Sequence, residues 1–269
     1  MRPRLIVTAA TIALLAGTGG TIGARADRGG ARLRDVPPPP PEENPCLGPE
    51  APKLRCPDIQ MGKPADMYAE RTPGGHVLLR ATNNVKSRGK GPVFFRGRRT
   101  GRNEMRARQH IYRVNGTQLI AHTGAELYWK HIPGQGHYWK FTNAAAFELW
   151  SVDRQGRRVK LVRKGPKVYY CLRDLEHTKP EKGSPRSRVF PGCSQNHRKR
   201  SVTLGTSRGW SDIYPSTYYQ QWIDVTGLHG CFAYVHRADP KGRIWESNEG
   251  NNDSQRIIRL PWGRKKKCP

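Results

Sequence analysis

The feature of this sequence that most restricts its fold is a long series of short apolar runs, each closed by a turn signal. The runs are rich in β-branched and aromatic residues, and turns such as VNGT, DRQGR and DPKGR separate them. No long segment repeats its apolar positions with the period of a helix. We therefore predict an all-β protein, a single β-sandwich-type domain with long loops and disulfides. The predicted strands lie within 74–85, 88–99, 108–114, 117–122, 125–132, 146–153, 158–164, 167–172, 220–226, 231–239 and 256–262.

The first residues have the composition of a secretory signal. Two arginines precede the apolar run LIVTAATIALLAGTGG, and Ala24-Arg25-Ala26 resembles a cleavage site. A membrane anchor is the alternative, but Thr and Gly interrupt the run, and a span needs about 20 apolar residues in succession. We therefore predict a secreted chain, which the cell surface could retain, with no transmembrane segment after cleavage. The predicted parts are a signal peptide (1–26), a proline-rich linker (27–45), a folded domain (46–263) and a basic tail (264–269).

The chain contains six cysteines, an even number that indicates disulfide bonds in an exported protein. No two of them have the short spacing of a zinc site. Because a shorter loop closes at a lower entropic cost, partners near in sequence are favoured, although spacing alone leaves the connectivity open. The favoured pairs are Cys46–Cys56, Cys171–Cys193 and Cys231–Cys268.

The charge of the chain restricts its partners. The sequence holds 48 Lys and Arg against 21 Asp and Glu, a formal net charge of +27 at pH 7. Such an excess attracts polyanions at long range, and outside the cell these include teichoic and uronic acid polymers, DNA, anionic lipids and acidic proteins. The positive charge is spread along the chain rather than concentrated in one basic helix. Specific nucleic-acid recognition is therefore not favoured.

A series of motifs, in order and at similar spacing, resembles the lysyl oxidase family in its bacterial secreted form. KVYYCLRD (167–174) is similar to the family's Lys-x-x-Phe-Cys-Leu-x-Asp segment, and LLRATNNVKSRGKGPVFFRG (78–97) is similar to its N-terminal strand pair. The segment 207–253 is similar to its Gly-Trp-x-Asp-x-Tyr, Gln-Trp-Ile-Asp-Val-Thr-Gly and Glu-Ser-Asn-x-x-Asn-Asn series. The resemblance extends from about Cys56 to Pro261 and implies the lysyl oxidase fold.

The resemblance also implies oxidative deamination of peptidyl lysine or another primary amine, with copper and a lysine tyrosylquinone as cofactors. Carried over by position, the quinone precursors are Lys167 and Tyr214, and the general base is Asp212. A tyrosine ring oxidised beside copper becomes an electrophile to which a neutral lysine amine can add. A carboxylate within reach of the bound substrate then removes its α-proton. The alternatives are a surface lysine, a packing tyrosine and a turn-forming aspartate.

The copper-binding motif of the family is not retained in this sequence. The family places three histidines at alternate positions of one strand, so that three imidazoles point to one face. The flanking aromatic residues fix the alignment, and the three ligand positions fall on Gly136, Tyr138 and Lys140. An ammonium group has no lone pair and would repel copper.

One histidine, His137, is left in the motif. It lies between the ligand positions, so we expect it to face the other side of the strand unless a bulge shifts the register. A site rebuilt from other histidines stays open, and the candidates nearby are His110, His122 and His131.

Three functions are compatible with the sequence. The favoured one is a secreted lysyl-oxidase-like protein that is catalytically impaired, holds neither copper nor the quinone, and binds anionic cell-surface polymers. The second is an active copper- and quinone-dependent amine oxidase that produces aldehyde, ammonia and hydrogen peroxide. The third is an extracellular structural or adhesion module, which a large exposed aromatic patch would indicate.

Overall fold

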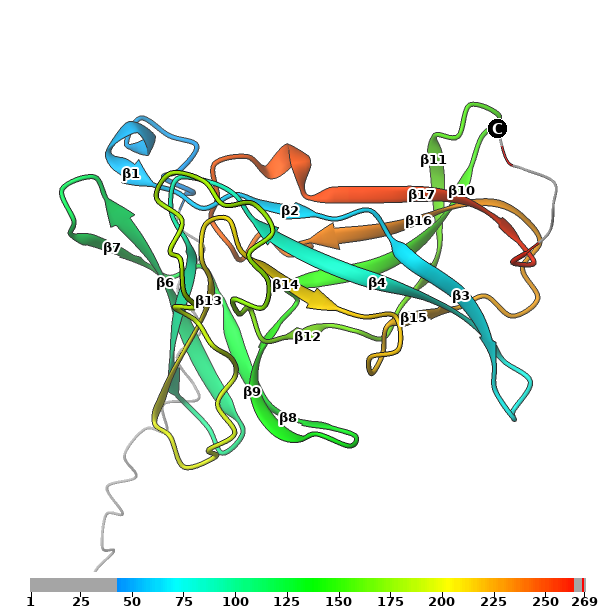
Figure 1. Ribbon diagram of the computed structural model, residues 1–269, viewed down its shortest axis with the longest axis horizontal. Helices are drawn as coiled ribbons and strands as arrows, with labels where there is room; N and C mark the ends of the chain where they lie inside the picture. Colours follow the sequence, from blue (N-terminus) through cyan, green and yellow to red (C-terminus); the bar gives the residue numbers. More distant parts are fainter. Residues whose placement is uncertain (1–42, 264–267, 269) are drawn as a thin grey trace, which may run out of the picture. The chain divides into compact units, whose positions relative to one another are not determined.

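A computed structural model describes residues 43–263 and 268 (Figure 1). The predicted signal peptide, residues 27–42 of the predicted linker, and all of the predicted tail except Cys268 lie outside the described residues. Contacts divide the chain into Met1–Asp35, which is not described, and Val36–Pro269. The described residues form strands and two short 3₁₀ helices, Ala51–Lys53 and Glu249–Asn251, so the predicted all-β class is confirmed. No helix among them has the length and apolar character needed to cross a membrane.

The largest sheet has eight strands in the order β12-β9-β8-β6-β5-β13, with the short strands β1 and β7 paired to β6. Its pairings are antiparallel. Because strands are pleated, successive residues alternate between its two faces. In β5, Val93, Phe95 and Gly97 are buried, whereas Arg96 and Arg98 are exposed. The strands are β1 (Leu54–Arg55), β5 (Val93–Arg99), β6 (Glu104–Arg113), β7 (Gln118–Ala121), β8 (Glu126–Ile132), β9 (Gly136–Thr142), β12 (Tyr169–Tyr170) and β13 (Ser201–Thr206).

Two smaller antiparallel sheets complete the fold. One has four strands in the order β11-β10-β16-β17, and the other has five strands built around β4. β4 is 11 residues long and pairs with β2, β3, β14 and β15. The strands are β2 (Ile59–Met61), β3 (Ala65–Arg71), β4 (Val77–Ser87), β10 (Ala145–Val152), β11 (Arg158–Lys164), β14 (Ser211–Tyr214), β15 (Trp222–Asp224), β16 (Gly230–Ala238) and β17 (Asp253–Leu260).

Two apolar cores lie between sheets, and β4 contributes to both; a third, smaller core lies against β1, β6 and β7. Near its start, Leu79 packs in a core that includes Phe147 of the four-stranded sheet. Near its end, Val85 belongs to a second core with Phe95 of the eight-stranded sheet and Tyr214 of β14. Sheets that pack face to face over shared apolar layers form a sandwich-type architecture, as predicted.

The three predicted disulfide pairs are confirmed. The bonds join Cys46 to Cys56, Cys171 to Cys193 and Cys231 to Cys268, so no described cysteine is free. The second bond ties the residue after β12 to the loop that precedes β13. β13 was not predicted from the sequence. The basic run RKRS (198–201) comes directly before it and obscures the alternation of apolar and polar residues in the strand.

Candidate functional site

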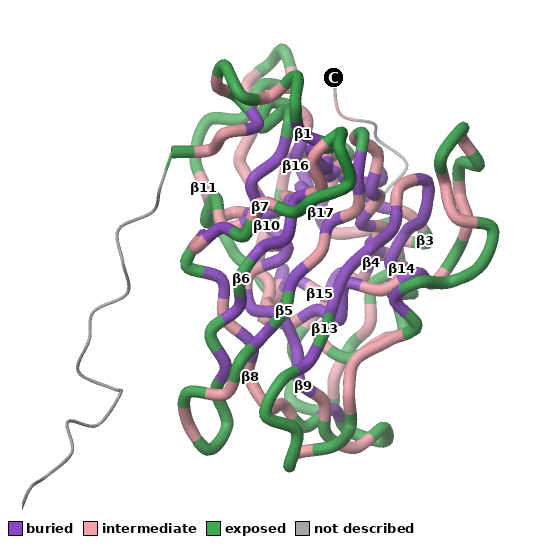
Figure 2. The backbone as a smooth tube through the Cα atoms, turned by 90° about the vertical axis from the view of Figure 1, so that its left-hand side faces the viewer, coloured by how far each residue is buried: buried purple, intermediate pink, exposed green. Residues whose placement is uncertain are grey.

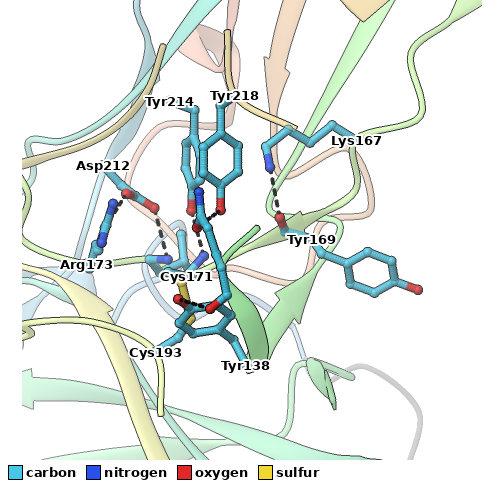
Figure 3. The surroundings of a disulfide bond; sticks show 11 residues. Tyr138, Lys167, Tyr169, Cys171, Arg173, Cys193, Asp212, Tyr214 and Tyr218 are labelled. Atoms are coloured by element: carbon cyan, nitrogen blue, oxygen red, sulfur yellow. Dashed lines mark hydrogen bonds and ion pairs between the residues drawn. A yellow bond between two sulfur atoms is a disulfide. The ribbon is translucent and has the colours of Figure 1, made fainter. Parts of the chain in front are cut away.

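The residues carried over as quinone precursors and general base lie together between the five-stranded and eight-stranded sheets. β14 places Asp212 and Tyr214 opposite Val85 and Asn83 of β4. Because they are two positions apart on a strand, their side chains point to the same face, and both are buried. Lys167 precedes β12, and its Nζ lies 4.3 Å from the centroid of the Tyr214 ring (Figure 3).

The segment after β12 is hydrogen-bonded directly to the side chains of β14. The backbone N–H of Cys171 donates to the Tyr214 hydroxyl at 2.8 Å. The N–H of Leu172 donates to Asp212 Oδ2 at 3.1 Å, and Arg173 Nε donates to Asp212 Oδ1 at 3.3 Å. These contacts fix the orientation of both functional candidates on β14, and Figure 3 shows them beside the disulfide of Cys171.

Burial dominates the ionisation of this group of residues. It raises the pKa of Asp212, and the positive charge of Arg173 partly offsets the rise. It raises the pKa of Tyr214 well above its ordinary range, so the phenol stays protonated at neutral pH. Burial also lowers the pKa of Lys167 well below its ordinary range, and the nearby charge of Lys140 lowers it further. The site therefore favours the neutral, nucleophilic form of the Lys167 amine.

Aromatic rings surround the Lys167 amine on several sides. Its Nζ lies 4.8 Å from the ring centroids of both Tyr170 and Tyr218, in addition to its contact with Tyr214. The carbonyl oxygen of Tyr169 accepts a hydrogen bond from Nζ at 3.3 Å. The amine thus sits against ring faces, with one polar partner, on a side chain that is almost fully buried.

Lys140 enters the same group from β9. Its side chain is fully buried, and its Nζ lies 5.8 Å from the Tyr214 ring centroid and 5.7 Å from that of Tyr218. No hydrogen-bond acceptor contacts this ammonium among the described residues. Burial lowers the pKa of Lys140 to about 8, and Asp212 limits the fall.

The other two aligned copper positions lie on the same strand. Tyr138 shares a face with Lys140, whose Nζ lies 5.8 Å from the Tyr138 ring centroid. The Tyr138 hydroxyl donates to the carbonyl oxygen of Gln135 at 3.0 Å. Gly136 has a φ of 95°, in the left-handed region that favours glycine. The three positions are therefore occupied by a buried lysine, a tyrosine and a glycine, and none of them carries an imidazole.

His137 belongs to an aromatic group on the opposite face of β9. Its ring stacks on Trp129 at a centroid distance of 5.7 Å, and His131 lies directly across the β8–β9 pair at 4.7 Å. Among the described residues, the only group of three that could hold a metal by distance consists of Asp239, Glu246 and Glu249. No rebuilt three-histidine cluster forms from His110, His122, His131 and His137 in that part of the chain.

Three residues of the site were not identified from sequence patterns. Tyr170 and Tyr218 form ring contacts with Tyr214, at centroid distances of 5.2 Å each, and Arg173 pairs with Asp212. The tyrosine-rich segment YPSTYYQQW is a weak signal for the second of them, because aromatic density does not distinguish a site from a core.

The comparisons with known proteins agree with this geometry. The family model described as lysyl oxidase matches residues 95–261, which is more than half of the chain. A search of curated proteins finds no match. The matched segment contains β9, β12 and β14, the strands that hold or flank the residues of the site. The chain belongs to the lysyl oxidase family.

Proposed function

We propose that this chain is a secreted member of the lysyl oxidase family that has lost its copper site and acts by binding anionic polymers outside the cell. The observation that carries the proposal is Lys140. At a position where the family supplies a copper ligand, its buried side chain points toward Tyr214 and Tyr218.

Copper does not fit the residues at this place. An imidazole donates a lone pair to the metal, whereas an ammonium has none and repels a divalent cation. In its neutral form, the Lys140 amine would supply only one ligand to the metal, and Gly136 has no side chain to supply another. If bound, copper would catalyse the oxidation of the tyrosine ring by dioxygen, so its loss leaves Lys167 and Tyr214 as an unmodified amine and phenol.

Secretion and polymer binding have separate support. Three disulfides are typical of a protein that folds in an oxidising compartment, and the first residues have the composition of a signal peptide. The net charge of +27 attracts polyanions and is screened by salt. Together these features favour an extracellular ligand of high negative charge.

The experiment uses the purified mature chain, loaded with copper in air. We expect less than one copper per chain, no reaction with phenylhydrazine, and an intact mass without a Lys–Tyr cross-link. We also expect binding to immobilised heparin that weakens steeply with salt. Stoichiometric copper with a hydrazine-reactive chromophore would overturn the loss of the copper site, and absence of polyanion binding at low salt would overturn the binding role.

An active amine oxidase is the second candidate, because Lys167, Tyr214 and Asp212 converge as the chemistry requires. This candidate expects a coloured protein that releases hydrogen peroxide from a diamine or a lysyl peptide. A colourless, hydrazine-silent protein after copper loading would exclude it.

A further inference from the structure

A block of arginines covers the outer face of the eight-stranded sheet, on β5 and β6. Arg96 and Arg98 of β5 are exposed, and so is Arg108 of β6. The antiparallel register places Arg96 directly opposite Arg108, and Arg98 directly opposite Arg106. Side chains on this face are therefore about 7 Å apart along a strand and about 5 Å apart across the pair. We call Arg96, Arg98 and Arg108 the arginine face; β5 and β6 lie toward the viewer in Figure 2.

The three residues of the arginine face have no carboxylate partner within residues 43–263 and 268. Like charges directly opposite each other destabilise a sheet, so a bound anion would stabilise this arrangement. The protein neutralises arginines elsewhere: Arg158 pairs with Asp253 at 2.7 Å, and Arg80 pairs with Glu70. What distinguishes this face is that its unpaired guanidinium groups lie side by side on two neighbouring strands.

A hollow in the sheet surface lies among these arginines. It has a volume of about 380 Å³, and its lining consists of Arg96, Arg98, Arg108, His110, Ile120 and Ser201. The floor is rigid, because the ring of His110 is 7% exposed and stacks on Phe94 at a centroid distance of 4.7 Å. Guanidinium groups on a fixed floor can bind carboxylate or sulfate through paired hydrogen bonds.

A second hollow continues the positively charged surface past Phe94. It has a volume of about 430 Å³, and its lining includes Arg55 and Lys90 together with Tyr112 and Phe190. Phe94 connects the two linings, because its ring contacts His110 of the first hollow at 4.7 Å, and Phe190 and Tyr112 of the second at 5.6 Å and 6.3 Å.

We propose that the arginine face, extended by this second hollow, is the binding site for an acidic polysaccharide that carries carboxylate or sulfate groups. The inference rests on the proposed polyanion-binding function and locates its site. A single-stranded nucleic acid fits less well, because its bases stack on exposed aromatic faces, and the one aromatic residue that lines the hollow among the arginines, His110, is only 7% exposed. A flat sheet face also offers no helix for the major groove of a duplex.

The test compares three forms of the mature chain by titration with heparin and with polygalacturonate at several salt concentrations. The site variant is Arg96→Gln/Arg98→Gln/Arg108→Gln. The matched control, Arg154→Gln/Lys160→Gln/Arg256→Gln, removes the same charge from exposed residues at β11, the turn before it, and β17. We expect the site variant to bind at least about tenfold more weakly, with a shallower dependence of log K on log salt, and the control to bind within about twofold of the unmodified chain.

A third variant separates charge from geometry. Arg96→Lys/Arg98→Lys/Arg108→Lys keeps the charge but loses the planar guanidinium group, and we expect its affinity to lie between those of the unmodified chain and the site variant.

If the unmodified chain binds and the site and control variants weaken equally, the arginine face is not the site, although the proposed function stands. If the unmodified chain binds no polyanion, both proposals fail. If a single-stranded oligonucleotide binds tighter than both polysaccharides and the site variant loses it, the ligand is a nucleic acid. Matching melting temperatures of all forms show that the folds are intact.

Discussion

At the scale of single residues, Lys140 is a cation enclosed in an apolar core, and burial lowers its pKa from 10.5 to about 8. Between these two values the unfolded chain binds more protons than the folded chain. The free energy of unfolding therefore rises with pH across this window and is lowest below it. Lys140→Met is expected to stabilise the protein by about 3 kcal/mol at pH 7 and by little near pH 10.5, as measured by urea unfolding.

Lys160→Met is the control for this prediction, since Lys160 is exposed on β11 and its replacement should change the free energy of unfolding little at either pH. An equal gain for Lys140→Met at both pH values would show that the buried ammonium is not its source.

A second residue-scale prediction concerns the copper positions. Gly136→His/Tyr138→His/Lys140→His restores alternate imidazoles on β9, and we expect one copper per chain and slow development of a hydrazine-reactive colour. Because Gly136 has a φ of 95°, the histidine there should lower the free energy of unfolding by roughly 1–3 kcal/mol. Adding Tyr214→Phe should leave copper binding intact and abolish the colour. Copper binding without colour in the triple variant would mean that Lys167 and Tyr214 are not poised for cross-linking.

At the scale of elements, alternation along a strand was readable from the sequence, and contacts between distant strands were not. Tyr138 and Lys140 were expected to share one face of their strand, with His137 on the other, and their ring contacts lie accordingly. The contact of Cys171 with Tyr214 joins positions 43 apart in the chain. It depends on β12 pairing with β9 and β14 pairing with β4. Periodicity contains no information on which strands become neighbours. Only the resemblance of the motifs to a known family indicated that these segments belong to one site.

The hydrogen bond between β14 and the segment after β12 can be tested by Tyr214→Phe. The change leaves the buried N–H of Cys171 without its acceptor and should lower the free energy of unfolding by about 1–3 kcal/mol. Tyr219→Phe is the matched control, because Tyr219 is 40% exposed, and its effect should be small. Equal effects of the two changes in urea unfolding would mean that the Tyr214 hydroxyl does not hold these elements together.

At the scale of the whole domain, β4 is the strand shared by the two larger apolar cores, a role that no local pattern revealed. Its run VLLRATNNV predicts a strand, but only the sheet pairings show that Leu79 faces one core and Val85 the other. We therefore expect the two cores to unfold together, since disruption of β4 removes packing from both sheets that depend on it.

Leu79→Ala tests this coupling. The side chain is fully buried, so its truncation should lower the free energy of unfolding by about 2–5 kcal/mol. In native-state hydrogen exchange, the slowest amides of β5–β6 and of β16–β17 should lose protection by the same amount, because both open in one global event. Val159→Ala, at a side chain 64% exposed, should change neither set. A loss of protection confined to β16–β17 would show that the core around Leu79 unfolds without the core that includes Val85 and Tyr214.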